Sequence, residues 1–134
     1  MPVTIGADSS QSILLVEDDQ QSQDLIKQIL KPLKVIVNDV SDGHDAIQHV
    51  ILHPGTNLIL MDLKLPVLDG YEATKVIRKL KPHIPIIAQT AYAMAGDREK
   101  AISAGCDEYI TKPIDSGNLL RLVKLYLSDY APGS

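Results

Sequence analysis

The chain has 134 residues, of which 45% are hydrophobic and 22% charged, and its formal net charge is −4. These proportions exclude a disordered chain and indicate one globular domain. The acidic balance argues against a nucleic-acid-binding surface. The longest apolar runs, such as Leu58 to Met61, are far too short to insert into a membrane. A single cysteine excludes an internal disulfide and a multi-cysteine zinc site.

The two ends of the chain differ in composition from its interior. Residues 1–11 are small and polar and contain no signal-peptide pattern, so we expect a flexible N-terminal tail and a cytoplasmic protein. Residues 130–134 end in Pro-Gly-Ser and are expected to form a C-terminal tail. Residues 12–129 are therefore predicted to make up the folded domain.

Short apolar runs alternate with segments whose apolar residues recur three and four positions apart, which predicts alternating strands and helices. In chain order, the expected elements are strand 13–16, helix 25–30, strand 35–37, helix 46–51, strand 58–61, helix 70–80, strand 86–89, helix 93–104, strand 108–111 and helix 119–127. Asp19 is expected to cap the first helix, and Gly105 to follow the fourth. Asn38 and Asp39 are expected to form a turn after the second strand. Five β-α units in succession predict an α/β fold, a doubly wound parallel sheet with helices on both faces.

In a parallel sheet of this kind, ligands bind beyond the carboxyl ends of the strands. The residues found there are polar: Glu17 and Asp18 after the first strand, Asp62 after the third, Thr90 after the fourth and Lys112 after the fifth. Carboxylates about 4 Å apart repel by roughly 4 kcal/mol at an effective dielectric near 20, so a cation is expected among the three acids. Oxygen ligands without histidine or cysteine favour Mg²⁺ or Mn²⁺.

The threonine hydroxyl and the lysine ammonium at the same edge suit phosphate oxygens. Together with the acids and a metal they predict a phosphoryl site, in which Asp62 is either a metal ligand or a nucleophile that forms an aspartyl-phosphate. Each residue has an ordinary explanation when taken alone, such as a helix cap or a surface lysine, and the prediction depends on their convergence at four strand ends. His49 and His53 lie four residues apart but lack a third ligand, so no second metal site is predicted.

Four segments resemble the sequence motifs of a known family. They are Ile13–Asp19 (ILLVEDD), Leu58–Gly70 (LILMDLKLPVLDG), Ile86–Ala91 (IIAQTA) and Asp107–Pro113 (DEYITKP). In this order and at these spacings they are similar to the receiver domains of two-component response regulators, over about residues 12–127. The resemblance implies a flavodoxin-like, CheY-like fold, a five-stranded sheet in the order 2-1-3-4-5.

The resemblance also implies roles for single residues. Asp62 is the expected acceptor of a phosphoryl group from the phosphohistidine of a histidine kinase or histidine phosphotransfer protein, and Lys112 is expected to pair with that group. The implied ligands of Mg²⁺ or Mn²⁺ are Asp18, Asp62, the backbone carbonyl of Lys64, and Glu17 through a water molecule. Such a receiver catalyses only its own phosphorylation and dephosphorylation, so we expect a signalling protein and not an enzyme.

The family resemblance further implies a conformational switch. Thr90 is expected to hydrogen-bond the phosphoryl group while Tyr109 turns inward. This movement alters the face formed by residues 93–104, residues 108–111 and the last helix. That face is the expected surface for a homodimer or an effector.

Three further features emerge when the chain is set beside the family pattern. Lys64 and Tyr92 stand where the family tunes the lifetime of the phosphoryl group, and their identities predict slow to intermediate autodephosphorylation. The Lys112–Pro113 peptide matches a cis bond of the family. Gln89 is polar where an apolar residue is more usual, and nothing in the sequence explains it.

Three other functions are less consistent with the sequence than a receiver is. A phosphorylation-independent pseudo-receiver binding module would normally have lost Asp62, Thr90 or Lys112, all of which are present. An aspartate-nucleophile phosphatase of the haloacid dehalogenase kind carries a second acid two residues after its nucleophile, where this chain has Lys64. A flavodoxin-like FMN carrier needs a hydroxyl-rich loop where this chain has acids. We expect either a stand-alone regulator or the receiver of a hybrid histidine kinase or multidomain regulator.

Overall fold

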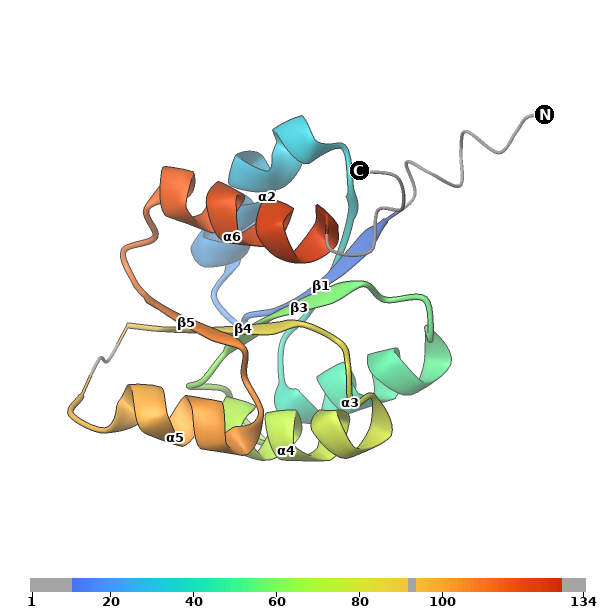
Figure 1. The fold of residues 1–134 in the computed structure, drawn as a ribbon, viewed down its shortest axis with the longest axis vertical. Helices are drawn as coiled ribbons and strands as arrows, with labels where there is room; N and C mark the ends of the chain where they lie inside the picture. Colours follow the sequence, from blue (N-terminus) through green and yellow to red (C-terminus); the bar gives the residue numbers. More distant parts are fainter. Residues whose placement is uncertain (1–10, 92–93, 129–134) are drawn as a thin grey trace.

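The computed structural model describes residues 11–91 and 94–128, and within them five parallel strands form one sheet (Figure 1). The strands are β1 (Ser12–Val16), β2 (Ile36–Val40), β3 (Leu58–Asp62), β4 (Ile86–Thr90) and β5 (Glu108–Thr111). Their order across the sheet is β2-β1-β3-β4-β5, which confirms the predicted doubly wound α/β fold. The tails predicted for residues 1–11 and 130–134 fall almost entirely outside the described residues, so these boundaries stay a prediction.

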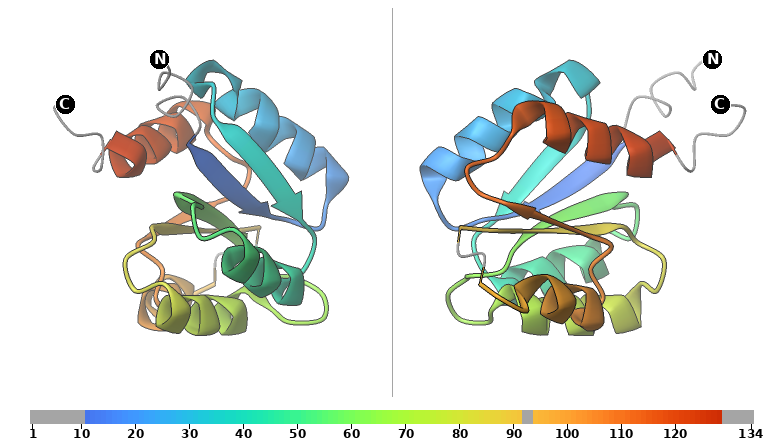
Figure 2. Two further views of the ribbon diagram at one scale, coloured as in Figure 1. Left: turned by 90° about the vertical axis from the view of Figure 1, so that its right-hand side faces the viewer. Right: turned by 60° about the vertical axis from the view of Figure 1, so that its left-hand side comes forward.

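Helices cover both faces of the sheet (Figures 1 and 2). On one face lie α2 (Gln20–Leu30), the short 3₁₀ helix η1 (Lys31–Leu33) and α6 (Ser116–Ser128), and on the other lie α3 (Gly43–Leu52), α4 (Gly70–Leu80) and α5 (Asp97–Ala104). In the described part of the chain, none of these helices has both the length and the apolarity needed to cross a bilayer.

The adjacent interior strands β1 and β3 supply much of the core. Every residue from Ile13 to Val16 and from Leu58 to Met61 is fully buried, as expected for strands that are covered on both faces. Side chains alternate between the faces: Leu14 packs with the α3–α5 layer, whereas Leu15 packs with α2 and α6. The uninterrupted apolar runs of the sequence therefore place these two strands, and the residues that follow them, in the interior of the sheet.

Three helices begin with an aspartate cap. The side chains of Asp19, Asp42 and Asp69 each accept a hydrogen bond of 2.8–2.9 Å from the backbone N–H three residues later. Such a cap is typically worth about 1 kcal/mol because it satisfies an otherwise unpaired N–H of the first turn. The predicted cap at Asp19 is confirmed, and it fixes where α2 begins after the acidic residues.

The prediction for the second strand is wrong at its carboxyl end. Asn38 and Asp39, expected in a turn, lie within β2 and pair with Leu14 and Leu15 of β1. Neither residue favours a strand by itself, so the pairing with β1 overrides local propensity. Asp39 also forms an ion pair with Lys27 of α2.

The fourth predicted helix begins later than expected. The prediction started it at residue 93, which lies outside the described residues, whereas α5 begins at Asp97. Gly96 precedes it with φ 86°, a left-handed conformation that interrupts a right-handed helix. At the other end Gly105 follows the helix with φ 123°, as predicted.

Candidate functional site

Three carboxylates meet at the carboxyl edge of β1 and β3. Val16 pairs with Met61, so the residues that follow them in the chain, Glu17 and Asp62, stand side by side, with Asp18 next to them. One carboxylate oxygen from each of the three acids lies within 4.8 Å of the others. Glu17 and Asp62 are buried, whereas Asp18 is exposed. The predicted convergence of the three acids is therefore present in the structure.

Backbone and side-chain hydrogen bonds hold Glu17 in place. Its N–H donates to the carbonyl of Val40 at 3.0 Å, and its carboxylate accepts from the N–H of Asp19 at 3.1 Å. Its carbonyl accepts from the buried amide of Gln23 at 2.6 Å. Sequence analysis missed Gln23, although a signal existed: it is a polar residue on the face of α2 that also buries Ile26.

Lys112 brings a positive charge to the acids from the end of β5. Its ammonium Nζ lies 2.6 Å from Glu17 Oε1 and 3.5 Å from Asp62 Oδ2. Its backbone N–H donates to the carbonyl of Thr90, and its peptide bond to Pro113 is cis, as predicted. Burial by itself would lower the pKa of Lys112, but the hydrogen bond to Glu17 and the charge of Asp62 outweigh it and raise that pKa.

The surroundings of Asp62 act on the pKa of its carboxyl in opposite directions. Burial raises the pKa of its carboxyl to about 7, and the neighbouring charge of Glu17 acts in the same direction. The N–H of Lys64, which donates to Asp62 Oδ1 at 3.0 Å, and the ammonium of Lys112 lower it. One half-buried cation, Lys112, facing three acids leaves excess negative charge, which a divalent cation would neutralise.

The loop after β3 approaches the acidic edge closely. A Cβ atom at Gly70 would lie 2.2 Å from the carbonyl oxygen of Asp62, so only glycine lets α4 begin at this point. The N–H of Gly70 donates to the carbonyl of Leu63 at 3.2 Å, and the N–H of Leu63 donates to the carbonyl of Gln89 on β4. These hydrogen bonds tie the backbone directly after Asp62 to the start of α4 and to β4.

The acids, Lys112 and Lys64 line one cavity of about 410 Å³. Asp19, Ser22 and Ala91 complete its wall, and sequence analysis assigned no site role to them. Because the donors are carboxylates, with no histidine or cysteine in this cluster, the set fits a hard divalent cation such as Mg²⁺ or Mn²⁺.

Two further predicted site residues lie in β4 and β5. Thr90 ends β4 and is buried. Tyr109, in β5, is half-buried against the α3–α5 side of the core, and burial raises its pKa. Its hydroxyl is buried and has no hydrogen-bond partner among the described residues. Tyr92 lies outside the described residues.

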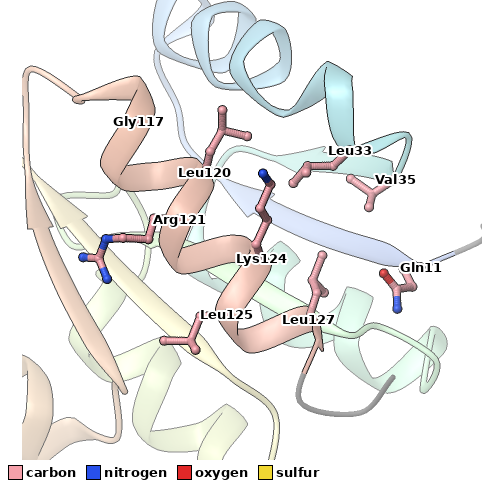
Figure 3. A pocket seen from close by; sticks show the side chains of 9 residues that line it. All are labelled: Gln11, Leu33, Val35, Gly117, Leu120, Arg121, Lys124, Leu125 and Leu127. Carbon is pink, nitrogen blue, oxygen red and sulfur yellow. The ribbon is translucent and has the colours of Figure 1, made fainter. Parts of the chain in front are cut away.

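A larger groove lies elsewhere, between α6 and the corner where η1 leads into β2 (Figure 3). Its volume is about 880 Å³, and its charged lining residues, Arg121 and Lys124, are both basic. The other lining residues are mostly aliphatic: Gln11, Leu33, Val35, Gly117, Leu120, Leu125 and Leu127. No carboxylate stands among them, so this groove does not have the donors of a metal site.

Known proteins are similar to this chain in sequence. The chain is 34% identical over 122 residues to the polar-differentiation response regulator DivK of Brucella ovis, an alignment that covers 90% of this chain and 98% of that protein. It is 38% identical over 130 residues to hybrid signal transduction histidine kinase I of Dictyostelium discoideum, and 36% identical over 137 residues to the histidine-protein kinase BarA of Escherichia coli K12. These alignments cover 90% and 100% of this chain but only 7% and 14% of the two kinases.

Solved structures of receiver domains are also similar to this chain. The receiver domain of the sensor histidine kinase PA1611 of Pseudomonas aeruginosa, crystallised with a magnesium ion in its active-site cleft, is 40% identical with a TM-score of 0.81. That match covers 89% of this chain and 98% of the other. A co-crystal structure of the Saccharomyces cerevisiae phosphotransfer protein Ypd1 with the receiver domain of Ssk1 matches with 30% identity and a TM-score of 0.79, covering 87% of this chain and 88% of the other. The family model for the response regulator receiver domain matches residues 13–124, and the chain therefore belongs to the receiver-domain family of two-component signalling.

Proposed function

We propose that this receiver domain accepts a phosphoryl group on Asp62 in a two-component phosphorelay. The observation that carries the proposal is the position of the Asp62 carboxylate, which is buried between a second acid, Glu17, and an ammonium group 3.5 Å away on Lys112. A cavity opens beside it, so a donor group has access to an otherwise buried nucleophile.

The transfer is an in-line displacement at phosphorus. A carboxylate oxygen of Asp62 attacks the phosphorus of a phosphohistidine, the new O–P bond forms as the P–N bond breaks, and the imidazole nitrogen leaves with the electron pair. Asp62 must be ionised to attack. The ammonium of Lys112 and the N–H of Lys64 both favour this ionised form, and Lys112 is placed to move from Glu17 to the transferred phosphoryl group.

The proposed ligands of Mg²⁺ or Mn²⁺ are Asp18, Asp62, the backbone carbonyl of Lys64 and, through water, Glu17. Their support is the set of three carboxylates within 4.8 Å and the excess negative charge of the site. When bound, the ion supplies positive charge that offsets both the acids and the phosphoryl oxygens. We propose no catalytic activity beyond phosphorylation and dephosphorylation of the domain itself.

The phosphoryl donor is proposed to be a histidine kinase or a histidine phosphotransfer protein in the cytoplasm. A hollow that continues from Lys112 toward α2 supports this, because Leu25, Pro113 and Ile114 line it beside the reactive edge. Leu25 is 50% exposed, which leaves an apolar contact for a partner that must bring its phosphohistidine to Asp62.

The response to phosphorylation is proposed to pass through Thr90 and Tyr109. The added charge and acceptor oxygens attract the Thr90 hydroxyl, and Tyr109 repacks between α5 and the sheet. The half-buried position of Tyr109 and its unpaired buried hydroxyl support two alternative packings. The proposed dimer or effector surface is the face of α5, β5 and α6, where Ile102 and Leu125 are exposed.

Lys64 and Tyr92 are the proposed regulators of phosphoryl lifetime. Lys64 is exposed at the mouth of the cavity, where its side chain can contact a phosphoryl group. We expect slow to intermediate autodephosphorylation, and a phosphoryl lifetime of seconds at room temperature would contradict it.

The test is the intact mass of the protein after incubation with Mg²⁺ and acetyl phosphate, beside Asp62→Asn. We expect a gain of one phosphoryl group that requires Mg²⁺ and disappears in the variant. A folded protein that gains none would instead be a phosphorylation-independent binding module. A phosphoryl group gained equally by the variant would move the acceptor to another residue.

A further inference from the structure

Gln89 is a buried polar residue that the packing around it does not explain. It lies in β4, its side chain is fully buried, and neither its amide nitrogen nor its amide oxygen has a hydrogen-bond partner among the described residues. A carboxamide can donate two hydrogen bonds and accept others, so burial without partners is unfavourable. An apolar residue of similar size would fill the same space without this cost.

The register of the sheet places Gln89 beside the reactive edge. Its neighbour on β3 is Asp62 and its neighbour on β5 is Ile110. Paired residues of adjacent parallel strands point to the same face, and Ile110 packs in the core under α2 and α6. Lys112 follows two residues after Ile110 and returns to that face. Gln89 therefore lies on the strand between those of Asp62 and Lys112, on the face to which Lys112 also returns.

The groups on either side of Gln89 change partners in the proposed reaction. In this structure the ammonium of Lys112 is engaged mainly with Glu17, at 2.6 Å, and lies 3.5 Å from Asp62. After transfer, the ammonium of Lys112 turns toward the phosphoryl group. Its three N–H groups then need acceptors other than Glu17. Oδ1 of Asp62, taken as the oxygen that bonds to phosphorus, keeps the N–H of Lys64, whereas Oδ2 loses the Lys112 ammonium that lies 3.5 Å from it in this structure and needs another donor.

We propose that Gln89 is a positioning residue for phosphoryl transfer. Its amide N–H donates to the Asp62 carboxyl oxygen that is not bonded to phosphorus, and its amide oxygen accepts from the ammonium of Lys112. The amide is thus paired in the phosphorylated state and unpaired before it, which favours transfer. This inference rests on the proposed phosphoacceptor role of Asp62.

The first test measures phosphorylation of Gln89→Met, which keeps the length of the side chain and removes the amide. The full chain is titrated with acetyl phosphate at constant Mg²⁺, and the rate is followed by intact mass. We expect the maximal rate to fall by about fivefold to tenfold, the effect of one lost hydrogen bond, while the half-saturating acetyl phosphate concentration stays unchanged. The matched control is Thr74→Val in α4, another fully buried polar residue, whose hydroxyl lies near Cys106 on the opposite face.

The second test separates positioning from a purely structural role. Urea unfolding is measured with and without Mg²⁺ and beryllofluoride, a mimic of the phosphoryl group. Gln89→Met should raise the urea midpoint in the absence of these ligands, because it removes an unpaired amide. Addition of the ligands should raise the urea midpoint of this variant by less than it raises that of the unsubstituted protein. Gln89→Leu is studied in parallel, so that a folding defect specific to methionine does not decide the result.

The outcomes are distinguishable. If the unsubstituted protein takes up a phosphoryl group and both Gln89 variants match its maximal rate and its gain from beryllofluoride, the positioning role is refuted and the amide is satisfied by internal water alone. If the unsubstituted protein takes up no phosphoryl group, the proposed function fails, and this inference fails with it. A reduced rate with a reduced ligand gain supports the role.

Discussion

The acidic edge and the region around Tyr109 differ in how completely their polar groups are paired. At the edge, Glu17 has partners for its N–H, its carbonyl and both carboxylate oxygens. In β5, the Tyr109 hydroxyl is buried without a partner among the described residues. The proposed chemistry thus sits in a part of the molecule that is already organised. The proposed response passes through Tyr109, whose buried hydroxyl is still unpaired in the described part of the chain.

This contrast has a physical reason. Preorganised charges stabilise a transferred phosphoryl group without rearranging first, whereas a switch needs two packings of similar free energy. Unpaired buried groups raise the free energy of the unphosphorylated state and so bring the two packings closer together.

The largest effect is expected at the paired edge. Lys112→Met leaves Glu17 and Asp62 buried without their cation, so the free energy of unfolding should fall by about 3–5 kcal/mol without divalent ions. Urea unfolding measures it. The control is Lys27→Met, which breaks the more exposed ion pair with Asp39 and should cost no more than about 1 kcal/mol. Equal losses in both variants would show that the edge is no more organised than the surface.

The pH dependence of the free energy of unfolding should reveal the cost of burying the ionised Asp62 carboxylate. Burial raises the pKa of this carboxyl from 3.8 to about 7 on folding, so the folded protein binds more protons than the unfolded chain between these values. The free energy of unfolding should therefore fall as the pH rises from about 4 to about 7, by an amount of the order of 3 kcal/mol. Urea unfolding in the presence of a chelator measures this fall. Asp62→Asn should remove it, and an unchanged profile would contradict the burial of an uncompensated charge.

Addition of Mg²⁺ should relieve the same excess of negative charge. At a hundred times its dissociation constant, an ion that binds only the folded state stabilises it by about 2.7 kcal/mol. Thermal unfolding with Mg²⁺ and then with excess chelator measures the gain and its reversal. Glu17→Gln should reduce the gain, whereas Asp24→Asn, on an exposed acid of α2, should not. A gain that is the same in both variants would place the ion elsewhere.

The smallest effect is expected in the unpaired region, and it has the opposite sign. Tyr109→Phe removes a buried hydroxyl without a partner and should raise the free energy of unfolding by about 1 kcal/mol. Tyr126→Phe removes a hydroxyl that donates to Glu108 at 2.8 Å and should lower it by about 1 kcal/mol. Urea unfolding of the two variants compares them directly. Two losses of equal size would show that the Tyr109 hydroxyl has a partner.

Much of the fold and site could be read from local patterns in the chain. The apolar runs from Ile13 and Leu58 predict buried interior strands, because only a strand covered on both faces tolerates such a run. Parallel topology then requires the residues after those strands to share one edge. For that reason the grouping of Glu17, Asp18 and Asp62 was predictable before any coordinates.

The parts that depended on distant contacts were not predictable. Asn38 and Asp39 are strand residues only because β1 supplies their hydrogen-bond partners. Gln23 holds Glu17 through a contact between a helix and a strand end, and Lys112 is closer to Glu17 than to Asp62, a preference that sequence spacing does not encode.

The sequence by itself determined which residues reach the carboxyl edge of the sheet, since period and chain order decide the face and the end on which each residue lies. Only the tertiary structure decided which of their polar atoms are paired. Whether two polar atoms pair depends on differences of a few tenths of an ångström in the distance between elements far apart in the chain. The amide of Gln89 and the hydroxyl of Tyr109 show the result: both were visible as residue types, and only the packed sheet showed that both are buried and unsatisfied.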